Sequence, residues 1–275
     1  MRLRLLLSYL GTNYHGWQLQ AEGGPLTIQG VLEEKLAIIA REKIRVTGAG
    51  RTDAGVHALG QNAHCDLTTL PSHNLAHSLN ALLPWDIRVL AAIPVDTSFH
   101  ARFQSKTKTY VYRFWTERAF LPPQLAPFVW QTGPMNLEAM QEALPSVTGT
   151  HDFRSLENSG SDIKTHVRTI FAAKLERAPA NPYLPKHAPE LILSVTADGF
   201  LKQMVRNLAG LLALVGTGHI APKDLAGILD QHKREANPAR TAPARGLTLA
   251  RIVYDNDPLL AKNPDQSPEH TANGI

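Results

Sequence analysis

The chain of 275 residues has a single cysteine, Cys65, and it has no long apolar run. One cysteine excludes an intramolecular disulfide and suits the reducing cytoplasm. Charged or polar residues interrupt each apolar stretch well before the roughly eighteen residues that a membrane span needs. The start, MRLRLLLSYLG, has too short an apolar core for a signal peptide, and no small-residue cleavage site follows it. We therefore expect a cytoplasmic protein without a membrane segment.

Recognised metal and nucleotide motifs are also missing. The twelve histidines are scattered, with no HExxH and no CxxC pattern. His73 and His77 share one helical face but have no third ligand. The sequence contains no P-loop, no dinucleotide fingerprint and no GxSxG elbow. We expect no metal, no cofactor and no serine nucleophile.

What the sequence does have is a basic folded body. The net charge is +4, but residues 106–254 carry eighteen Lys and Arg against twelve Asp and Glu, and residues 255–275 carry one against four. Such a body attracts polyanions, although an excess of this size is also common on proteins that bind none. The charge is thus compatible with a nucleic-acid partner and does not decide for one.

Hydrophobic periodicity predicts the same order of elements twice. In the first half we expect helices that begin at Thr27 and Ser72, and strands over 2–9, 43–48, 58–68 and 86–95. In the second half we expect helices over 136–144, 200–215 and 222–232, and strands over 108–116, 166–176, 190–197 and 247–254. Apart from the added helix 222–232, each half has the order βαββαβ, a ferredoxin-like split βαβ unit.

This order predicts an α+β fold in which two ferredoxin-like halves, 1–105 and 106–254, form one broad mixed or antiparallel sheet. Helices are expected on one face, with a cleft open on the other and the active site at the joint between the halves. Residues 255–275 have three prolines and an acidic excess, so we expect a disordered tail.

One carboxylate, Asp53, lies in the glycine-rich stretch GAGRTDAGVHALGQ at 48–61. Glycines allow left-handed backbone conformations and close approach to another molecule. By itself, an aspartate in such a loop is typical of an Asx turn. Because the other chemical motifs are missing, Asp53 is the remaining candidate for a catalytic group.

The segment GRTDAGVHA at 50–58 resembles the signature of the tRNA pseudouridine synthase A family. Further segments resemble that family in the same order: YLGTNYHGWQ, FHARF, YVY, HDF, KQMVRNLAG and TAPARGL. Together they span about 9–254. The resemblance implies the pseudouridine synthase fold, cofactor-independent isomerisation of uridine to pseudouridine at positions 38, 39 and 40 of the tRNA anticodon stem-loop, and a homodimer.

The resemblance also implies roles for individual residues. Asp53 matches the catalytic aspartate, which acts either as a nucleophile at C1′ or by proton abstraction in a glycal route. Arg206 matches the arginine that pairs with it, although by spacing alone Lys202 and Arg206 read equally well as a surface pair. Tyr110 matches the tyrosine that covers the uracil, with its hydroxyl a candidate for the later proton transfer from C5. Without the resemblance Tyr110 is ordinary strand core.

Four further residues are candidates for substrate binding. Arg51 resembles the residue that fills the space of the flipped base, and without the resemblance it is a phosphate contact or a solvated loop charge. Leu247 resembles the apolar residue that packs against the target base, and otherwise it simply begins the last strand. Phosphate contacts are expected to be spread over Lys106, Lys108, Lys202, Arg245 and similar basic residues, and Lys164, Arg168 and Arg154 are equal alternatives.

Two other functions remain open from the residues. One is an RNA-binding module that has lost its activity, against which the intact Asp53, Arg206 and Tyr110 argue. The other is a nucleoside hydrolase or glycosidase, which would normally use a second carboxylate or a metal. The sequence offers no partner acid of that kind.

Overall fold

The computed structural model describes residues 1–20, 23–69, 74–160, 163–179 and 189–259. The elements of the first half are β1 (Arg2–Tyr9), α1 (Ile28–Ala40), β2 (Thr47–Gly48), β3 (His57–Asp66), α2 (Leu75–Leu82) and β4 (Ile87–Val95). Those of the second half are β5 (Thr107–Trp115), β6 (Trp130–Gln131), α3 (Leu137–Ala143), β7 (Gly149–Asp152), β8 (Val167–Arg177), β9 (Glu190–Ala197), α4 (Met204–Gly216), α5 (Asp224–Leu229) and β10 (Leu247–Val253).

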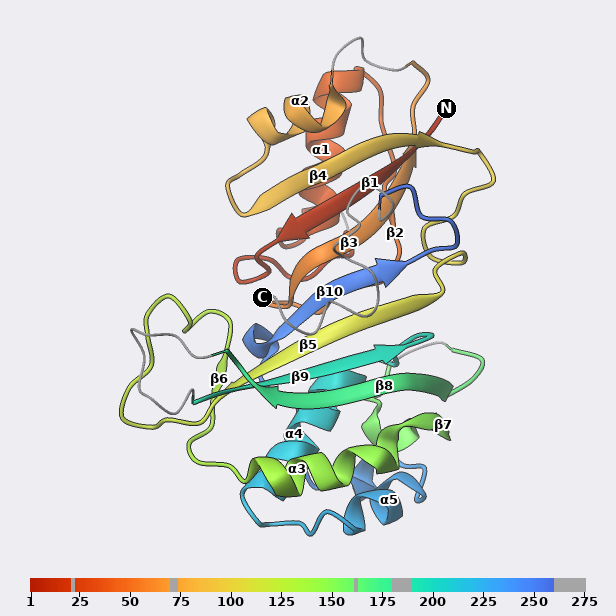
Figure 1. The fold of residues 1–275 in the computed structure, drawn as a ribbon. Helices are drawn as coiled ribbons and strands as arrows, with labels where there is room; N and C mark the ends of the chain where they lie inside the picture. Colours follow the sequence, from red (N-terminus) through yellow and green to blue (C-terminus); the bar gives the residue numbers. More distant parts are fainter. Residues whose placement is uncertain (21–22, 70–73, 161–162, 180–188, 260–275) are drawn as a thin grey trace.

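The strands form one ten-stranded sheet in the order β4-β1-β3-β10-β5-β9-β8-β7, with β2 added to β3 and β6 to β5 (Figure 1). The order β4-β1-β3-β2 in the first half recurs as β10-β5-β9-β8 in the second, and neighbours within each set are antiparallel. The two sets meet where β10 pairs with β3 in parallel, Leu249 opposite Ala58. This mixed sheet confirms the predicted α+β fold. The residue at which the halves divide stays a prediction.

Local signals account for the first helix. Thr27 caps α1 by accepting a hydrogen bond from the Gly30 backbone N–H, and Arg41 ends it in the left-handed conformation. Ile28, Leu32 and Leu36 are fully buried and lie at helical spacing. The alternate residues of β1 are buried as well, so α1 and β1 contribute to one core.

Several predicted boundaries are wrong. The strand expected over 43–48 is reduced to Thr47–Gly48, because side chains of α1 form hydrogen bonds with the backbone N–H and carbonyl oxygen of Val46. Gln29 donates to the Val46 carbonyl oxygen at 3.0 Å, and Glu33 accepts from the Val46 N–H at 2.9 Å. The sheet ladder therefore cannot continue through Val46.

Two helices begin later than predicted. Asn74 caps α2 by accepting from the His77 N–H, while Ser72 lies outside the described residues. Helix α4 starts at Met204 rather than at residue 200, because Gln203 has a left-handed backbone with φ 60°. The helix expected over 222–232 is only the six residues of α5. The short strands β6 and β7 were not predicted.

The start of the predicted tail contacts the sheet through Asp257. Asp257 forms an ion pair with Arg4 of β1 at 2.8 Å, and each side chain is only 3% exposed. The Arg4 guanidinium also lies 4.3 Å from the centre of the Tyr254 ring. Asp257 is therefore fixed against β1, residues 260–275 lie outside the described part, and the expectation of a disordered tail stays a prediction.

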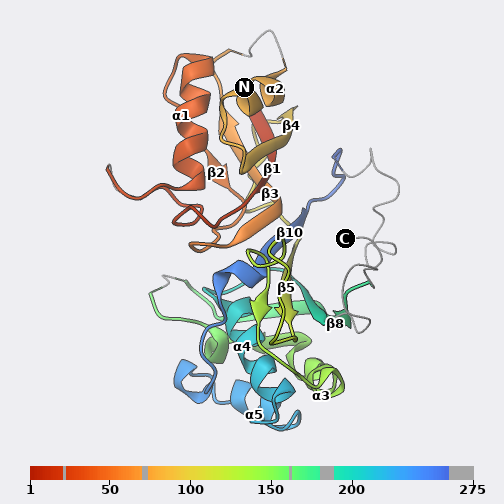
Figure 2. The same ribbon diagram turned by 90° about the vertical axis from the view of Figure 1, so that its left-hand side faces the viewer.

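Helices α1 and α4 lie on the same side of the sheet (Figure 2). Strand pairing places Tyr9, Ala58, Leu249 and Tyr110 in one row that crosses the joint between the halves. Tyr9 belongs to the buried alternate residues of β1, so this row faces the helices. It forms the floor on which the candidate site is built.

Candidate active site

The Asp53 loop connects β2 to β3 and is held in place by the segment that follows β1. Thr52 accepts from the Trp17 N–H at 3.0 Å, and Gly55 donates to the Tyr14 carbonyl oxygen at 3.2 Å. Gly16 has φ +86°, and a Cβ added there would lie 2.5 Å from the Thr52 carbonyl oxygen. Only glycine allows this approach, so Gly16 lets this segment pack directly against the backbone beside Asp53.

Polar side chains support the loop from the sheet. The hydroxyl groups of Tyr9 and Thr52 lie 2.8 Å apart, and Gln61 donates to the Gly50 carbonyl oxygen at 2.8 Å. Burial raises the pKa of Tyr9 to about 12, although its hydrogen bonds to Thr52 and Gln61 oppose this shift. The phenol therefore stays neutral at physiological pH.

Asp53 and Arg206 form an ion pair between the two halves. Arg206 Nη1 lies 3.1 Å from Asp53 Oδ2, with the side chains 13% and 34% exposed. Arg206 Nε donates to the Ala242 carbonyl oxygen at 2.8 Å, so the guanidinium is fixed at two points. Within the described residues, no hydrogen bond reaches the other carboxylate oxygen, Oδ1. The pair thus presents a partly exposed, oriented carboxylate with one oxygen uncommitted.

Tyr110 lies close enough to Asp53 for the two to interact electrostatically. It is 8% exposed, and its ring meets Phe200 edge-on with centroids 5.0 Å apart. Burial, and then the neighbouring Tyr9 and Asp53, raise the pKa of Tyr110 well above its ordinary value. A hydroxyl that keeps its proton can donate it to a bound base. Since Tyr110 faces the helices, the predicted cleft on the helix-free face is wrong, and the ion pair lies on the helix-bearing face.

Two predicted binding residues lie beside these three. Leu247 begins β10, is 6% exposed and pairs with Tyr112 of β5. Arg51 is exposed in the Asp53 loop, and its Nε donates to Gln18 at 3.1 Å.

The other two predicted binding residues hold loops. Lys202 precedes α4 instead of lying on it, and its Nζ donates to the Ser159 carbonyl oxygen at 2.8 Å. Arg245 Nε donates to the Val129 carbonyl oxygen at 3.1 Å. The structure therefore brings together Asp53, Arg206 and Tyr110, but it does not bring Lys202 or Arg245 into contact with them.

Asn207 has a part that the sequence reasoning missed. It is fully buried, donates to the Leu156 carbonyl oxygen at 2.7 Å and accepts from the Thr241 hydroxyl at 2.7 Å. Asn207 thus holds Thr241 in place, and the carbonyl oxygen of the next residue, Ala242, accepts the hydrogen bond from Arg206 Nε. The sequence offered one sign of this role, an amide side chain in an otherwise apolar stretch of α4. A side chain in such a stretch is buried, and a buried amide needs hydrogen-bond partners.

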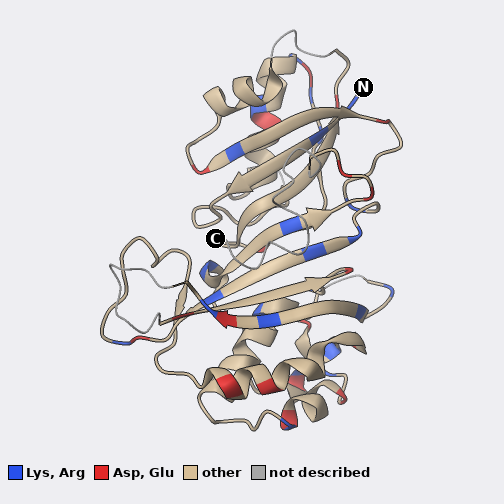
Figure 3. Ribbon diagram, in the orientation of Figure 1, with Lys and Arg blue, Asp and Glu red and all other residues tan. Residues whose placement is uncertain are grey.

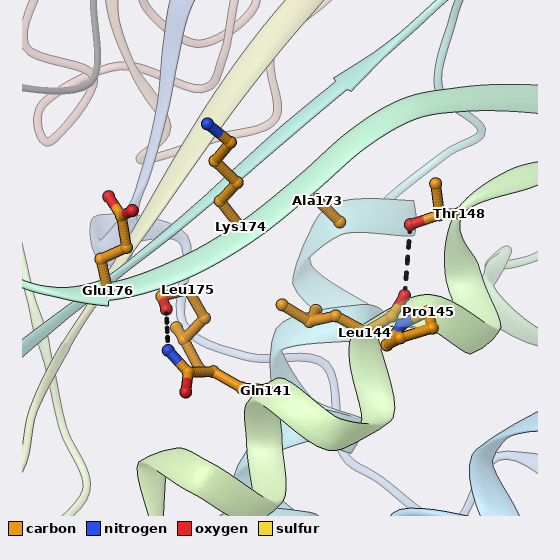
Figure 4. A pocket seen from close by; sticks show the side chains of 8 residues that line it. All are labelled: Gln141, Leu144, Pro145, Thr148, Ala173, Lys174, Leu175 and Glu176. Atoms are coloured by element: carbon orange, nitrogen blue, oxygen red, sulfur yellow. Dashed lines mark hydrogen bonds between the residues drawn. The ribbon is translucent and has the colours of Figure 1, made fainter.

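The described part of the chain has a further hollow but no cluster of metal ligands. There, no three His, Cys, Asp or Glu side chains cluster as metal ligands would, and none of the helices has the length and apolar character needed to span a bilayer. A hollow between α3 and β8 is lined by Gln141, Lys174 and six neighbours (Figure 4). None of Asp53, Arg206 or Tyr110 lines it, so this hollow is separate from the ion pair.

A model of the family described as tRNA pseudouridine synthase matches residues 6–104 and 143–255. The chain belongs to this family. The matched segments include Asp53 and Arg206, while Tyr110 lies in the stretch between them. The family assignment thus covers both partners of the ion pair.

Two similar proteins match this chain over nearly its full length and over nearly their own. The chain is 44% identical over 273 residues to tRNA pseudouridine synthase A of Oleidesulfovibrio alaskensis, covering 93% of this chain and 97% of the relative. It is 46% identical over 261 residues to the protein of the same name from Lawsonia intracellularis, covering 92% and 99%. Among solved structures, it overlaps with the one titled "Crystal Structure of a Cbf5-Nop10-Gar1 Complex" at a TM-score of 0.32 and 12% identity, over 77% of this chain and 45% of the other.

Proposed function

We propose that this protein converts uridine to pseudouridine in the anticodon stem-loop of tRNA, at positions 38, 39 and 40. The observation that carries the proposal is the 3.1 Å contact between Asp53 and Arg206, with Tyr110 in electrostatic contact with the carboxylate. The reaction breaks the bond from C1′ to N1 and forms a bond from C1′ to C5. It is an isomerisation and needs no co-reactant.

In this proposal Asp53 acts on the ribose. Its uncommitted Oδ1 either attacks C1′ or takes a proton from the sugar to give a glycal, and Arg206 holds Oδ2 in both routes. After the uracil has rotated and rejoined through C5, that carbon loses its proton and N1 gains one. The hydroxyl of Tyr110 is the group in the site that can relay this proton.

A stem nucleotide must leave its stack before the carboxylate can reach the sugar. Arg51 is exposed two residues before Asp53, where it can enter the space that the base vacates. Leu247 offers an apolar contact for the extruded base. Lys202 and Arg245 are proposed to contact phosphates through the ammonium and guanidinium N–H groups that do not already donate to the Ser159 and Val129 carbonyl oxygens.

The assembly and the compartment belong to the same proposal. We infer a homodimer in which one tRNA contacts both subunits, acting in the cytoplasm without a metal or cofactor. We also infer that the chain divides functionally into residues 1–105, which carry Asp53, and residues 106–254, which carry Arg206 and Tyr110. The single cysteine supports a reducing compartment.

The test compares wild type with Asp53→Asn, using tRNA transcripts that lack the modification. Pseudouridine is measured at each position after reaction, and tRNA binding is measured separately. We expect binding to persist in Asp53→Asn while conversion disappears. Asp230→Asn, at an exposed carboxylate after α5, is the matched control and should react like wild type. A wild-type protein that binds tRNA without converting uridine would support the binding module instead.

A further inference from the structure

Lys108 lies beside the catalytic loop and has no partner among the residues that the structure describes. It lies on β5 two residues before Tyr110, so both side chains are on the same face of the strand. Its Cε lies 3.9 Å from the point where a Cβ on Gly50 would be. Within the described residues its ammonium group makes no ion pair and no hydrogen bond. A half-buried ammonium without a partner is costly, because neither water nor a carboxylate fully compensates its charge.

The charges around Lys108 increase this cost. Burial, and then the cations of Arg102 and Arg168, lower the pKa of Lys108 to about 8, and Asp198 opposes them. Asp198 is itself engaged, because its Oδ1 accepts from the Thr169 N–H at 3.1 Å. Three cations therefore face one carboxylate, and Lys and Arg recur along the strands β10, β5 and β8 (Figure 3).

An anion at this point would relieve the repulsion. Arg168 is held by its Nη1, which donates to the carbonyl oxygens of Thr165 and Val167. Arg102 is exposed on the loop before β5. Because Lys108 shares its face with Tyr110 and reaches toward the Asp53 loop, the anion would lie beside the nucleotide whose ribose meets Asp53.

We propose that Lys108, together with Arg102 and Arg168, binds a backbone phosphate of the RNA next to the target uridine. This inference rests on the proposed function, and it adds a subsite that fixes the sugar relative to the carboxylate. Lys108 is then a positioning residue, since it holds the substrate and takes no part in bond making.

The first experiment removes the charge and restores it. Lys108→Met removes the ammonium and Lys108→Arg keeps a cation, while Lys174→Met removes an exposed lysine of β8 as the matched control. Binding of an anticodon stem-loop RNA is measured by fluorescence anisotropy with Asp53→Asn also present, so that no conversion occurs. We expect Lys108→Met to weaken binding about tenfold and to lower the slope of log affinity against log salt by about one unit. Lys108→Arg and Lys174→Met should stay within about twofold of the parent.

The second experiment identifies the phosphate. Stem-loops are made with one neutral methylphosphonate at a time, at the phosphates that flank the target uridine. For the parent protein, one of these substitutions should weaken RNA binding by about the factor seen with Lys108→Met. The same substitution should not weaken RNA binding by the Lys108→Met variant any further. Equal losses in both proteins at every position would overturn the proposal.

Activity separates this inference from the function on which it rests. If wild type converts uridine and Lys108→Met converts it with unchanged kcat and KM, the subsite is refuted while the function stands. If wild type converts none, the proposed function fails first. With Lys108 as the subsite, KM of wild type should rise between pH 7 and 9 as the free lysine loses its proton, and Lys108→Arg should lack this rise.

Discussion

The carboxylate of Asp53 and the guanidinium of Arg206 lie 3.1 Å apart, although they are 153 residues apart in the sequence. Arg206 also holds the Ala242 carbonyl oxygen at 2.8 Å, and the Ala242 N–H donates to the Arg206 carbonyl oxygen at 3.2 Å. The ion pair is therefore supported by a backbone clamp within the second half. Its two contacts require a planar side chain with several donors, which lysine does not have.

Replacing Arg206 should impair the chemical step more than binding. Arg206→Lys keeps the charge but cannot hold Asp53 and Ala242 together, so we expect a loss of at least tenfold in the single-turnover rate. Arg206→Gln, which also removes the charge, should lose about a hundredfold or more. Rates are measured at saturating tRNA, with circular dichroism as the check on folding. Equal rates for wild type and Arg206→Lys would show that the clamp is unimportant.

The hydroxyl of Tyr110 can be tested apart from its ring. Tyr110→Phe keeps the edge-on contact with Phe200 and removes the proton that burial retains on the phenol. We expect tRNA binding within twofold of wild type and a chemical step slower by about a hundredfold. Tyr112→Phe is the matched control, since its hydroxyl donates to the Pro243 carbonyl oxygen at 2.9 Å. If the two variants slow the reaction equally, the effect belongs to packing and not to proton transfer.

The loop that carries Asp53 depends on glycine at position 16. Gly16→Ala places a Cβ 2.5 Å from the Thr52 carbonyl oxygen on a backbone with φ +86°. We expect a stability loss of about 1–3 kcal/mol and a lower rate, because the backbone next to Asp53 must move. The free energy of unfolding is measured in urea beside the single-turnover rate.

Gly227→Ala is the control for this change. An added Cβ at Gly227 on α5 meets no heavy atom within 4 Å. Alanine also favours a helix over glycine by up to about 1 kcal/mol. Gly227→Ala should therefore be as stable as wild type or more so, with unchanged activity. A Gly16→Ala protein that behaves in the same way would contradict the role of the close approach.

How far the sequence predicted the structure depends on whether the deciding contact is local. The start of α1 was predicted correctly, because the Thr27 cap and the apolar spacing lie within the helix itself. The strand predicted over 43–48 was wrong, because the side chains of Gln29 and Glu33 on α1 form hydrogen bonds with the backbone groups of Val46. Hydrophobic periodicity does not reveal that side chains compete with a neighbouring strand for backbone hydrogen bonds.

The site shows the same limit. The resemblance predicted that Asp53 and Arg206 pair, whereas their spacing in the sequence could not, since they come from different halves of the sheet. Lys202 was placed on the helix of Arg206 by counting back four residues, and the left-handed Gln203 removes it from that helix. The position of Lys108 beside Gly50 likewise depends on how β5 packs against the Asp53 loop.

His64 predicts how stability depends on pH. It lies on β3 with 6% exposure, and its Nδ1 accepts from the Ala101 N–H at 3.2 Å. Burial, and then the charges of His100 and Arg2, lower the pKa of His64 to about 4, and the charge of Asp66 opposes them. The folded protein therefore keeps His64 neutral at a pH where an unfolded chain, with a histidine pKa of about 6.5, takes up a proton.

The unfolded state binds more protons between pH 6.5 and 4, so stability falls as the pH drops through this range and is fully present above it. Between pH 7.5 and 5.0 this residue should account for a loss of about 2 kcal/mol in the free energy of unfolding. Urea unfolding at the two pH values measures the loss. His64→Gln keeps an acceptor for Ala101 and should remove most of it, whereas His77→Gln, on the exposed side of α2, should not. If His64→Gln loses as much stability on acidification as wild type, the pH dependence arises from other groups.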